Sequence, residues 1–160
     1  MKFTRGTIFA SIAFVSILAT FPAWAAATVA VSLWDNPAMD MAMGLGHGMG
    51  GDMSKASMGI RAAPDSVPAG TVTFQVKNDS KDTVHEMILA PLKSPDEVLP
   101  YNENGGRVDE EAAGHLGEVA ELDPGAKGAL TVDLKPGSYL LYCNMPGHYM
   151  GGMWTVVEVK

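Results

Sequence analysis

Several residue types are scarce in this 160-residue chain, and each shortage excludes a class of protein. It contains a single cysteine, Cys143, so no disulfide can form within the chain. It has 11 lysine and arginine residues against 18 aspartates and glutamates, a formal net charge of −7, which argues against a nucleic-acid partner. A mostly apolar run at Thr7–Thr20 is too short for a comfortable membrane span.

The first 25 residues have the pattern of a secretory signal. Lys2 and Arg5 form a charged start, the apolar run follows, and Ala23-Trp24-Ala25 is a small-x-small cleavage site. We therefore expect cleavage after Ala25, export to the periplasm and no stable membrane insertion afterwards; retention of the segment as an anchor is the alternative. One domain, 26–160, would remain, and the loss of two cations would leave it at −9.

Short apolar runs separated by turn residues predict an all-β fold. The clearest run is Thr71–Lys77, in which Val72, Phe74 and Val76 share one face. Almost no helix is expected, except one or two turns around Asp109–Ala113. About eight strands in this pattern predict an antiparallel β-sandwich or Greek-key barrel. The expected strands are Thr28–Trp34, Met58–Ala62, Thr71–Lys77, Val84–Ala90, Leu116–Leu122, Ala129–Leu134, Tyr139–Cys143 and Trp154–Val159.

Two stretches interrupt this pattern. Residues 36–59 contain six methionines and six glycines without periodicity, which indicates an irregular or mobile insert. Residues 91–114 form a long excursion rich in aspartate and glutamate. Both stretches lie between expected strands, so we expect them to add to one sandwich and not to form a second domain.

One segment carries the chemistry: the loop between the last two expected strands. Cys143 and His148 are five residues apart, and Met153 follows after five more. Pro146-Gly147 and Gly151-Gly152 allow the chain to bend between them. Soft sulfur together with imidazole suits copper, and a Cys/His/His set with a weak axial Met is the blue-copper pattern. A second histidine must then come from elsewhere in the chain.

His85 is the candidate for that second histidine, because it begins an expected strand directly after a polar turn. In contrast, His115 ends the acidic excursion with no companion ligands in the sequence. Two other readings of the loop stay open. Cys143 could be a small buried apolar side chain in a loop that only packs, or a thiol nucleophile beside His148.

The string Tyr-Cys…Pro-Gly-His…Gly-Met-Trp-Thr-Val, with His85 upstream, resembles the cupredoxin family, close to the plastocyanin/pseudoazurin pattern. The resemblance covers residues 60–160 well and the first strand plausibly. It implies an eight-stranded Greek-key sandwich with one type 1 copper held by His85, Cys143, His148 and Met153. Many family members have asparagine directly after the first ligand histidine; here that residue is Glu86, which should point away from His85 along the strand.

The resemblance implies one-electron transfer through Cu(I)/Cu(II) and no enzymatic activity. One cysteine cannot bridge a dicopper site, and four histidines without a His-x-His pair are too few for a multicopper oxidase. The acidic excursion predicts a redox partner with a basic docking surface, and Pro146, Gly147, Tyr149 and Met150 would form an apolar rim around His148. The alternative function is periplasmic copper binding or tolerance, in which soft donors capture additional Cu(I). Those donors would be Met39, Met41, Met43, His47, Met49 and Met53.

Overall fold

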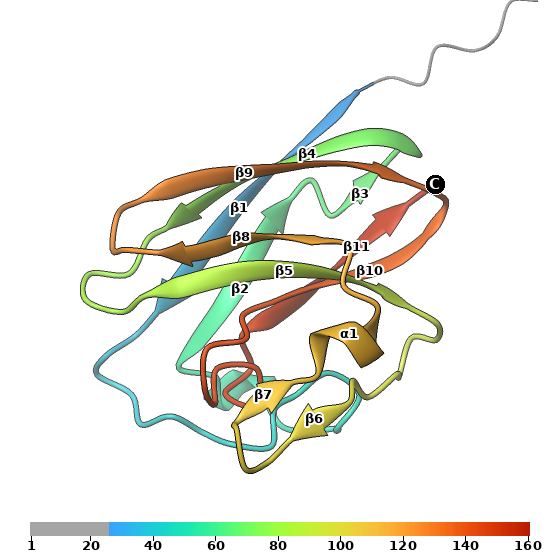
Figure 1. Ribbon diagram of the computed structural model, residues 1–160. Coiled ribbons are helices and arrows are strands. Elements are labelled where there is room, and N and C mark those ends of the chain that lie inside the picture. The colour runs from blue at the N-terminus through green and yellow to red at the C-terminus, as the bar shows by residue number, and fades with distance from the viewer. Residues whose placement is uncertain (1–25) are drawn as a thin grey trace, which may run out of the picture.

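The computed structural model describes residues 26–160, so the predicted signal segment, 1–25, lies outside the described residues. The described chain forms two β-sheets packed face to face, with loops and short elements gathered at one end (Figure 1). The elements are β1 (Ala27–Asp35), a 3-10 turn (Met53–Lys55), β2 (Met58–Ala63), β3 (Ser66–Val67), β4 (Gly70–Asn78), β5 (His85–Leu92), β6 (Tyr101–Asn102), β7 (Arg107–Val108), α1 (Glu110–Ala113), β8 (Gly117–Leu122), β9 (Lys127–Leu134), β10 (Gly137–Tyr142) and β11 (Trp154–Val159).

The sheet order confirms the all-β sandwich and adds a parallel component. One sheet has the order β2-β1-β4-β9, the other β3-β11-β10-β5-β8, and β6 pairs with β7 alone. β1 runs parallel to β4, and β3 parallel to β11. We expected an antiparallel sandwich or Greek-key barrel; the sandwich is present, but these two strand pairs are parallel. The chain reverses once into β2 and again before β4, so β4 reaches the other side of β1 in the same direction.

The core between the sheets follows the predicted alternation. Val72, Phe74 and Val76 on β4 are at most 2 % exposed and face Leu89 and Leu141 of the other sheet within one apolar cluster. Burial of a side chain of this size contributes about 1.5–3 kcal/mol. The core thus fixes the two sheets against each other, and with them the strand ends that carry the expected ligands.

A second apolar cluster covers the outer face of the five-stranded sheet. Ile88 and Tyr142 point outward from β5 and β10 and are covered by Leu99, Val108 and Ala113 of the excursion. Burial on both faces explains why β5 is continuously apolar from Met87 to Leu92 and does not alternate. The predicted helical turn is present as α1, begins after a capping Asp109, and lies beside β6 and β7 in Figure 1. Within the described residues no helix is long and apolar enough to cross a membrane.

The Met/Gly-rich segment between β1 and β2 crosses the end of the sandwich beside the β10–β11 loop (Figure 1). It is irregular, as predicted, but its middle is packed: Leu45 is 4 % and His47 5 % exposed. The Leu45 N–H donates to the Met150 carbonyl (2.9 Å), and the Trp154 indole N–H donates to the Leu45 carbonyl (2.6 Å). The segment is therefore anchored to the loop that carries the expected ligands.

Candidate metal centre

Three side chains from two segments that are distant in sequence converge at this end of the sandwich. His85 is the first residue of β5, Cys143 directly follows β10, and His148 lies in the β10–β11 loop. The His85 Nδ1 and His148 Nδ1 atoms are 3.2 Å apart, and the Cys143 Sγ lies 3.4 Å from His148 Nδ1. All three donor atoms lie within 4.8 Å of one another. These separations suit a single ion about 2.0–2.3 Å from each atom.

Met153, the predicted fourth ligand, is fully buried and belongs to the same apolar cluster as Cys143. Its carbonyl accepts from the Cys143 N–H (3.1 Å), and its N–H donates to the His148 carbonyl (3.0 Å). The loop can turn this tightly because Gly147 and Gly152 adopt φ values of 82° and 94°, which favour glycine. Cys143, His148 and Met153 thus lie in one compact loop, and His85 lies at the strand end beside it.

Burial controls the protonation of these donors. It lowers the pKa of His85 to about 4, with a further contribution from His148, and it lowers the pKa of His148 as well. It raises the pKa of the Cys143 thiol to about 12. Near neutral pH the metal-free protein therefore presents two neutral imidazoles and a protonated thiol. The imidazoles can bind a metal at once, whereas the thiol must first lose its proton.

A buried asparagine positions the start of β5. The side-chain amide of Asn78 donates to the carbonyls of Thr83 and Leu122, each at 2.8 Å, and its oxygen accepts from the Ser80 N–H (3.0 Å). These bonds hold the turn that delivers His85. The His85 Nε2 atom is buried and has no hydrogen-bond partner among the described residues.

Asn144 and Glu86 were not predicted to hold the site, yet the structure connects them to it. The Glu86 side chain is outside the donor group, as its place in the strand predicted, and its carboxylate accepts from the Asn144 N–H (3.1 Å). The Glu86 N–H in turn lies 3.5 Å from the Cys143 Sγ as donor. The strand that carries His85 is thus joined to the residue after Cys143. The sequence held one sign of this role: Asn144 is a polar residue directly after Cys143, between two apolar neighbours.

The predicted apolar rim is only partly present. Pro146 is exposed, and Gly147, His148 and Met150 are half-buried. Tyr149, however, is fully buried, so its assignment to the rim was wrong. Its ring packs into the outer cluster, and its hydroxyl donates to the His47 carbonyl (3.4 Å).

The predicted secondary Cu(I) ligands divide into two groups. His47 is buried, with Nδ1 2.7 Å from the Glu97 carbonyl oxygen, and its ring meets Trp154 edge-on. The five methionines are 37–57 % exposed: Met39, Met41, Met43, Met49 and Met53.

The expectation that His115 lacks companion ligands was wrong. Its ring lies with the carboxylates of Glu110 and Glu118, which have donor atoms within 4.8 Å. Glu110 is the first residue of the short helix α1, His115 follows the end of that helix, and Glu118 lies on β8, so the sequence alone gave no sign that the three residues meet.

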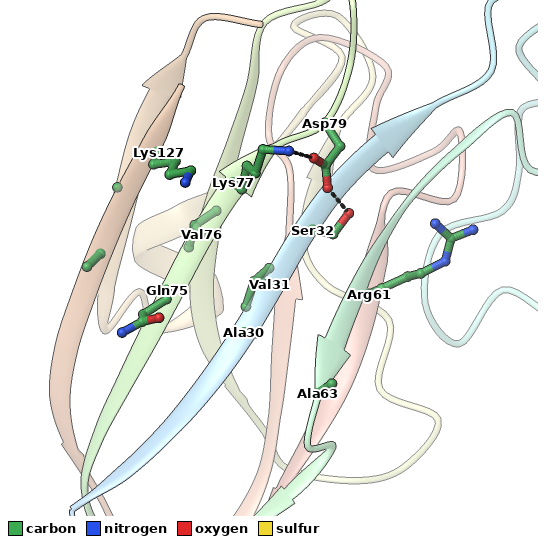
Figure 2. A pocket seen from close by; sticks show the side chains of 12 residues that line it. Ala30, Val31, Ser32, Arg61, Ala63, Gln75, Val76, Lys77, Asp79 and Lys127 are labelled. Atoms are coloured by element: carbon green, nitrogen blue, oxygen red, sulfur yellow. Dashed lines mark hydrogen bonds and ion pairs between the residues drawn. The ribbon is translucent and has the colours of Figure 1, made fainter. Parts of the chain in front are cut away.

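A hollow on the four-stranded sheet contains none of the predicted ligands. Arg61 and Lys127 lie at its sides, and Figure 2 shows Lys77 and Ser32 both reaching Asp79. The Ser32 hydroxyl donates to Asp79 (2.6 Å), and the Lys77 ammonium forms an ion pair with the same carboxylate. These contacts join β1 to the end of β4.

Comparison with solved structures identifies the fold. Auracyanin B matches with a TM-score of 0.55 and 22% identity, covering 89% of this chain and 93% of that one. Auracyanin from Roseiflexus castenholzii matches at 0.51 and 20% identity, covering 84% and 96%. Rusticyanin from Thiobacillus ferrooxidans matches at 0.53 and 18% identity, covering 83% and 76%.

No protein-family model matches the chain, and no curated protein matches it. These structures share less than 25% sequence identity with this chain, so the similarity shows the fold alone. The described chain has the cupredoxin-like β-sandwich of the auracyanins and of the copper protein rusticyanin, with His85, Cys143 and His148 converging at one end of it.

Proposed function

We propose that this chain is a periplasmic electron-transfer protein that holds one type 1 copper. The observation that carries the proposal is the convergence of one donor atom each from His85, Cys143 and His148 within 4.8 Å of one another. Two imidazoles and a thiolate, with the Met153 thioether as a long axial contact, are the donors that such a site requires. The likeness to auracyanin and rusticyanin supports the same assignment.

The bound copper would supply a one-electron Cu(I)/Cu(II) couple. His85 and Cys143 have no exposed surface, so the protein excludes water from this side of the site. His148 is half-buried and provides the route by which an electron reaches the surface. Because all four ligand residues are held by the core or by loop hydrogen bonds, little movement accompanies the change of charge. With four residues around the ion, no position stays open for a substrate, so we propose no enzymatic activity.

A redox titration tests this function. The copper-loaded protein should take up one electron per copper, keep the metal after reduction, and return to its starting spectrum on reoxidation. Release of the metal on reduction would contradict an electron carrier and would favour a delivery or storage role.

Periplasmic location is proposed from the sequence of residues 1–25. Mass spectrometry of the protein from the host should give a chain that begins at Ala26. An intact chain in the cytoplasm that still begins with Met1 would exclude this location.

The exposed methionines favour a second candidate function, capture of additional Cu(I) for copper tolerance. Methionine is usually a buried residue, and thioethers are soft ligands that select Cu(I). The sulfurs of Met49 and Met150 lie 3.0 and 3.3 Å from the point that a Cβ on Gly46 would occupy, so two thioethers flank one glycine. Met41 likewise lies against Gly147 and Gly151 of the ligand loop. Met41 thus packs against the loop that carries His148, and we propose that copper captured there could pass to the main site.

Substitution tests this candidate better than deletion, because deletion would also remove the packed Leu45 and His47. Replacing all five exposed methionines by leucine should remove any Cu(I) bound beyond one equivalent and leave the main site intact. Leu116→Met, which adds an exposed thioether outside the segment, is the matched control and should bind no extra Cu(I). Unchanged Cu(I) stoichiometry in the five-fold variant would exclude capture by this segment. Those five methionines are Met39, Met41, Met43, Met49 and Met53.

A further inference from the structure

Asn144, the residue after Cys143, is 2 % exposed, and both its backbone and its side chain are hydrogen-bonded to other segments. Its N–H donates to Glu86 Oε1 (3.1 Å), and its carbonyl accepts from the Arg107 guanidinium (2.7 Å). Its side chain bonds to both the N–H (2.7 Å) and the carbonyl (3.0 Å) of Val108, and donates to Glu110 Oε1 (2.7 Å). The position of this backbone, and so of Cys143, is determined by partners from two other segments.

Two of those partners carry opposite charges. Glu86 follows His85 on β5, and its side chain is 8 % exposed; Arg107 begins β7, and its side chain is 41 % exposed. The nearest nitrogen and oxygen of the pair are 3.9 Å apart. The Glu86 carboxylate accepts a hydrogen bond from the Asn144 N–H, and the Arg107 guanidinium donates one to the Asn144 carbonyl. Within the described residues Arg107 is the only cation in ion-pair range of the Glu86 carboxylate.

We propose that Glu86 and Arg107 act as a charge-paired clamp on Asn144: together they position Cys143, and separately they shift the reduction potential of the bound copper in opposite directions. The second half of this proposal rests on the proposed copper function. The first half concerns the protein alone and can be tested without metal.

The opposite directions follow from Coulomb's law. Cu(II) carries one more positive charge than Cu(I), so a nearby carboxylate stabilises the oxidised state and a nearby guanidinium stabilises the reduced state. Both groups are bonded to the backbone of Asn144, next to the thiolate ligand. Burial of the carboxylate limits its screening by water, which strengthens its effect on the site.

Paired substitutions that remove charge but keep hydrogen-bonding capacity test the electrostatic half. Measured at about pH 8, above the ordinary carboxyl range, Glu86→Gln should raise the potential and Arg107→Gln should lower it. The double variant should return close to the unmodified protein. Glu158→Gln and Lys135→Gln, exposed positions at the opposite end of the sheets, are matched controls and should leave the potential nearly unchanged.

If Glu86 and Arg107 had a merely structural role, both single substitutions would shift the reduction potential in the same direction, because both would loosen the same loop. Shifts of the same sign, or no shift in either variant, would overturn the electrostatic half. If the unmodified protein takes up copper without a one-electron couple, the proposed function fails instead. The clamp is then judged by the metal-free measurement.

Hydrogen exchange in the metal-free protein tests the positioning half. Glu86→Ala should greatly increase exchange of the Asn144 amide relative to core amides, whereas Glu86→Gln should restore most of the protection, because its amide oxygen can accept the same bond. Unchanged protection of Asn144 in Glu86→Ala would overturn the clamp. If the alanine variant does not fold, loss of Asn144 protection in Glu86→Gln would overturn it equally.

Discussion

Metal binding at this site should release one proton near neutral pH, and that proton should come from Cys143. Burial keeps both imidazoles neutral, with the pKa of His85 near 4, and keeps the thiol protonated up to a pKa of about 12. The metal requires a thiolate and neutral imidazoles. Cys143 must therefore give up a proton, whereas His85 and His148 have none to lose.

The magnitude follows from this stoichiometry. One proton released per metal makes the apparent affinity rise about tenfold per pH unit, equivalent to about 1.4 kcal/mol, between about pH 7 and 9. As the pH falls toward the pKa of His85, about 4, protons also compete with the metal for the imidazoles, and the dependence of the affinity on pH should steepen.

Zinc is a suitable probe, because it takes thiolate and imidazole ligands and does not oxidise a free thiol. Calorimetric titrations in buffers of different ionisation enthalpy would count the released protons. Cys143→Ser should abolish the release at neutral pH. Release of two or more protons at pH 7–8 would mean that the histidines are protonated in the metal-free protein. Release of none would mean that the thiolate is preformed, and either result would refute the reasoning from burial.

Three further predictions follow from the same structure. The free energy of unfolding of the metal-free protein should fall by about 3 kcal/mol as the pH falls from about 6.5 through about 4. The reason is that His85 is buried in its neutral form, whereas the unfolded chain takes up the proton. Denaturant unfolding at several pH values measures this loss, and a flat profile would contradict it. Asn144→Ala should lower the free energy of unfolding by about 2–4 kcal/mol, because Val108 and Glu110 lose their hydrogen bonds to the buried Asn144 side chain. A loss below about 1 kcal/mol would mean that water replaces the amide. Association with a basic redox partner should slow as salt rises, because exposed charges are screened beyond about 8–10 Å; stopped-flow rates independent of ionic strength would point to an apolar contact at Pro146 and Met150.

Most strands were predictable because their patterns are local. The eight expected strands are present with ends within two residues of the prediction. β3, β6 and β7 were not predicted, because two-residue strands carry no periodicity. The parallel pairing of β1 with β4 depends on the path of the chain between them, which no residue pattern in either strand encodes.

The ligand residues were predictable for a similar reason, whereas their supports were not. Cys143, His148 and Met153 lie in one loop with turn residues between them, and His85 follows a polar turn at a strand start. The contacts of Asn144 join residues 86, 107, 108, 110 and 144, and such long-range meetings leave no local signal. Tyr149 was misplaced because a loop has no periodicity that tells a buried side chain from an exposed one.

The most direct test of a type 1 copper at this site is a Cu(II) titration of residues 26–160 with visible absorption and metal analysis recorded together. We predict one tightly bound copper, an intense visible band that saturates at one equivalent, and loss of that band in Cys143→Ser. An intense band that survives Cys143→Ser, or one equivalent of copper bound without any such band, would contradict a thiolate-ligated copper at this site.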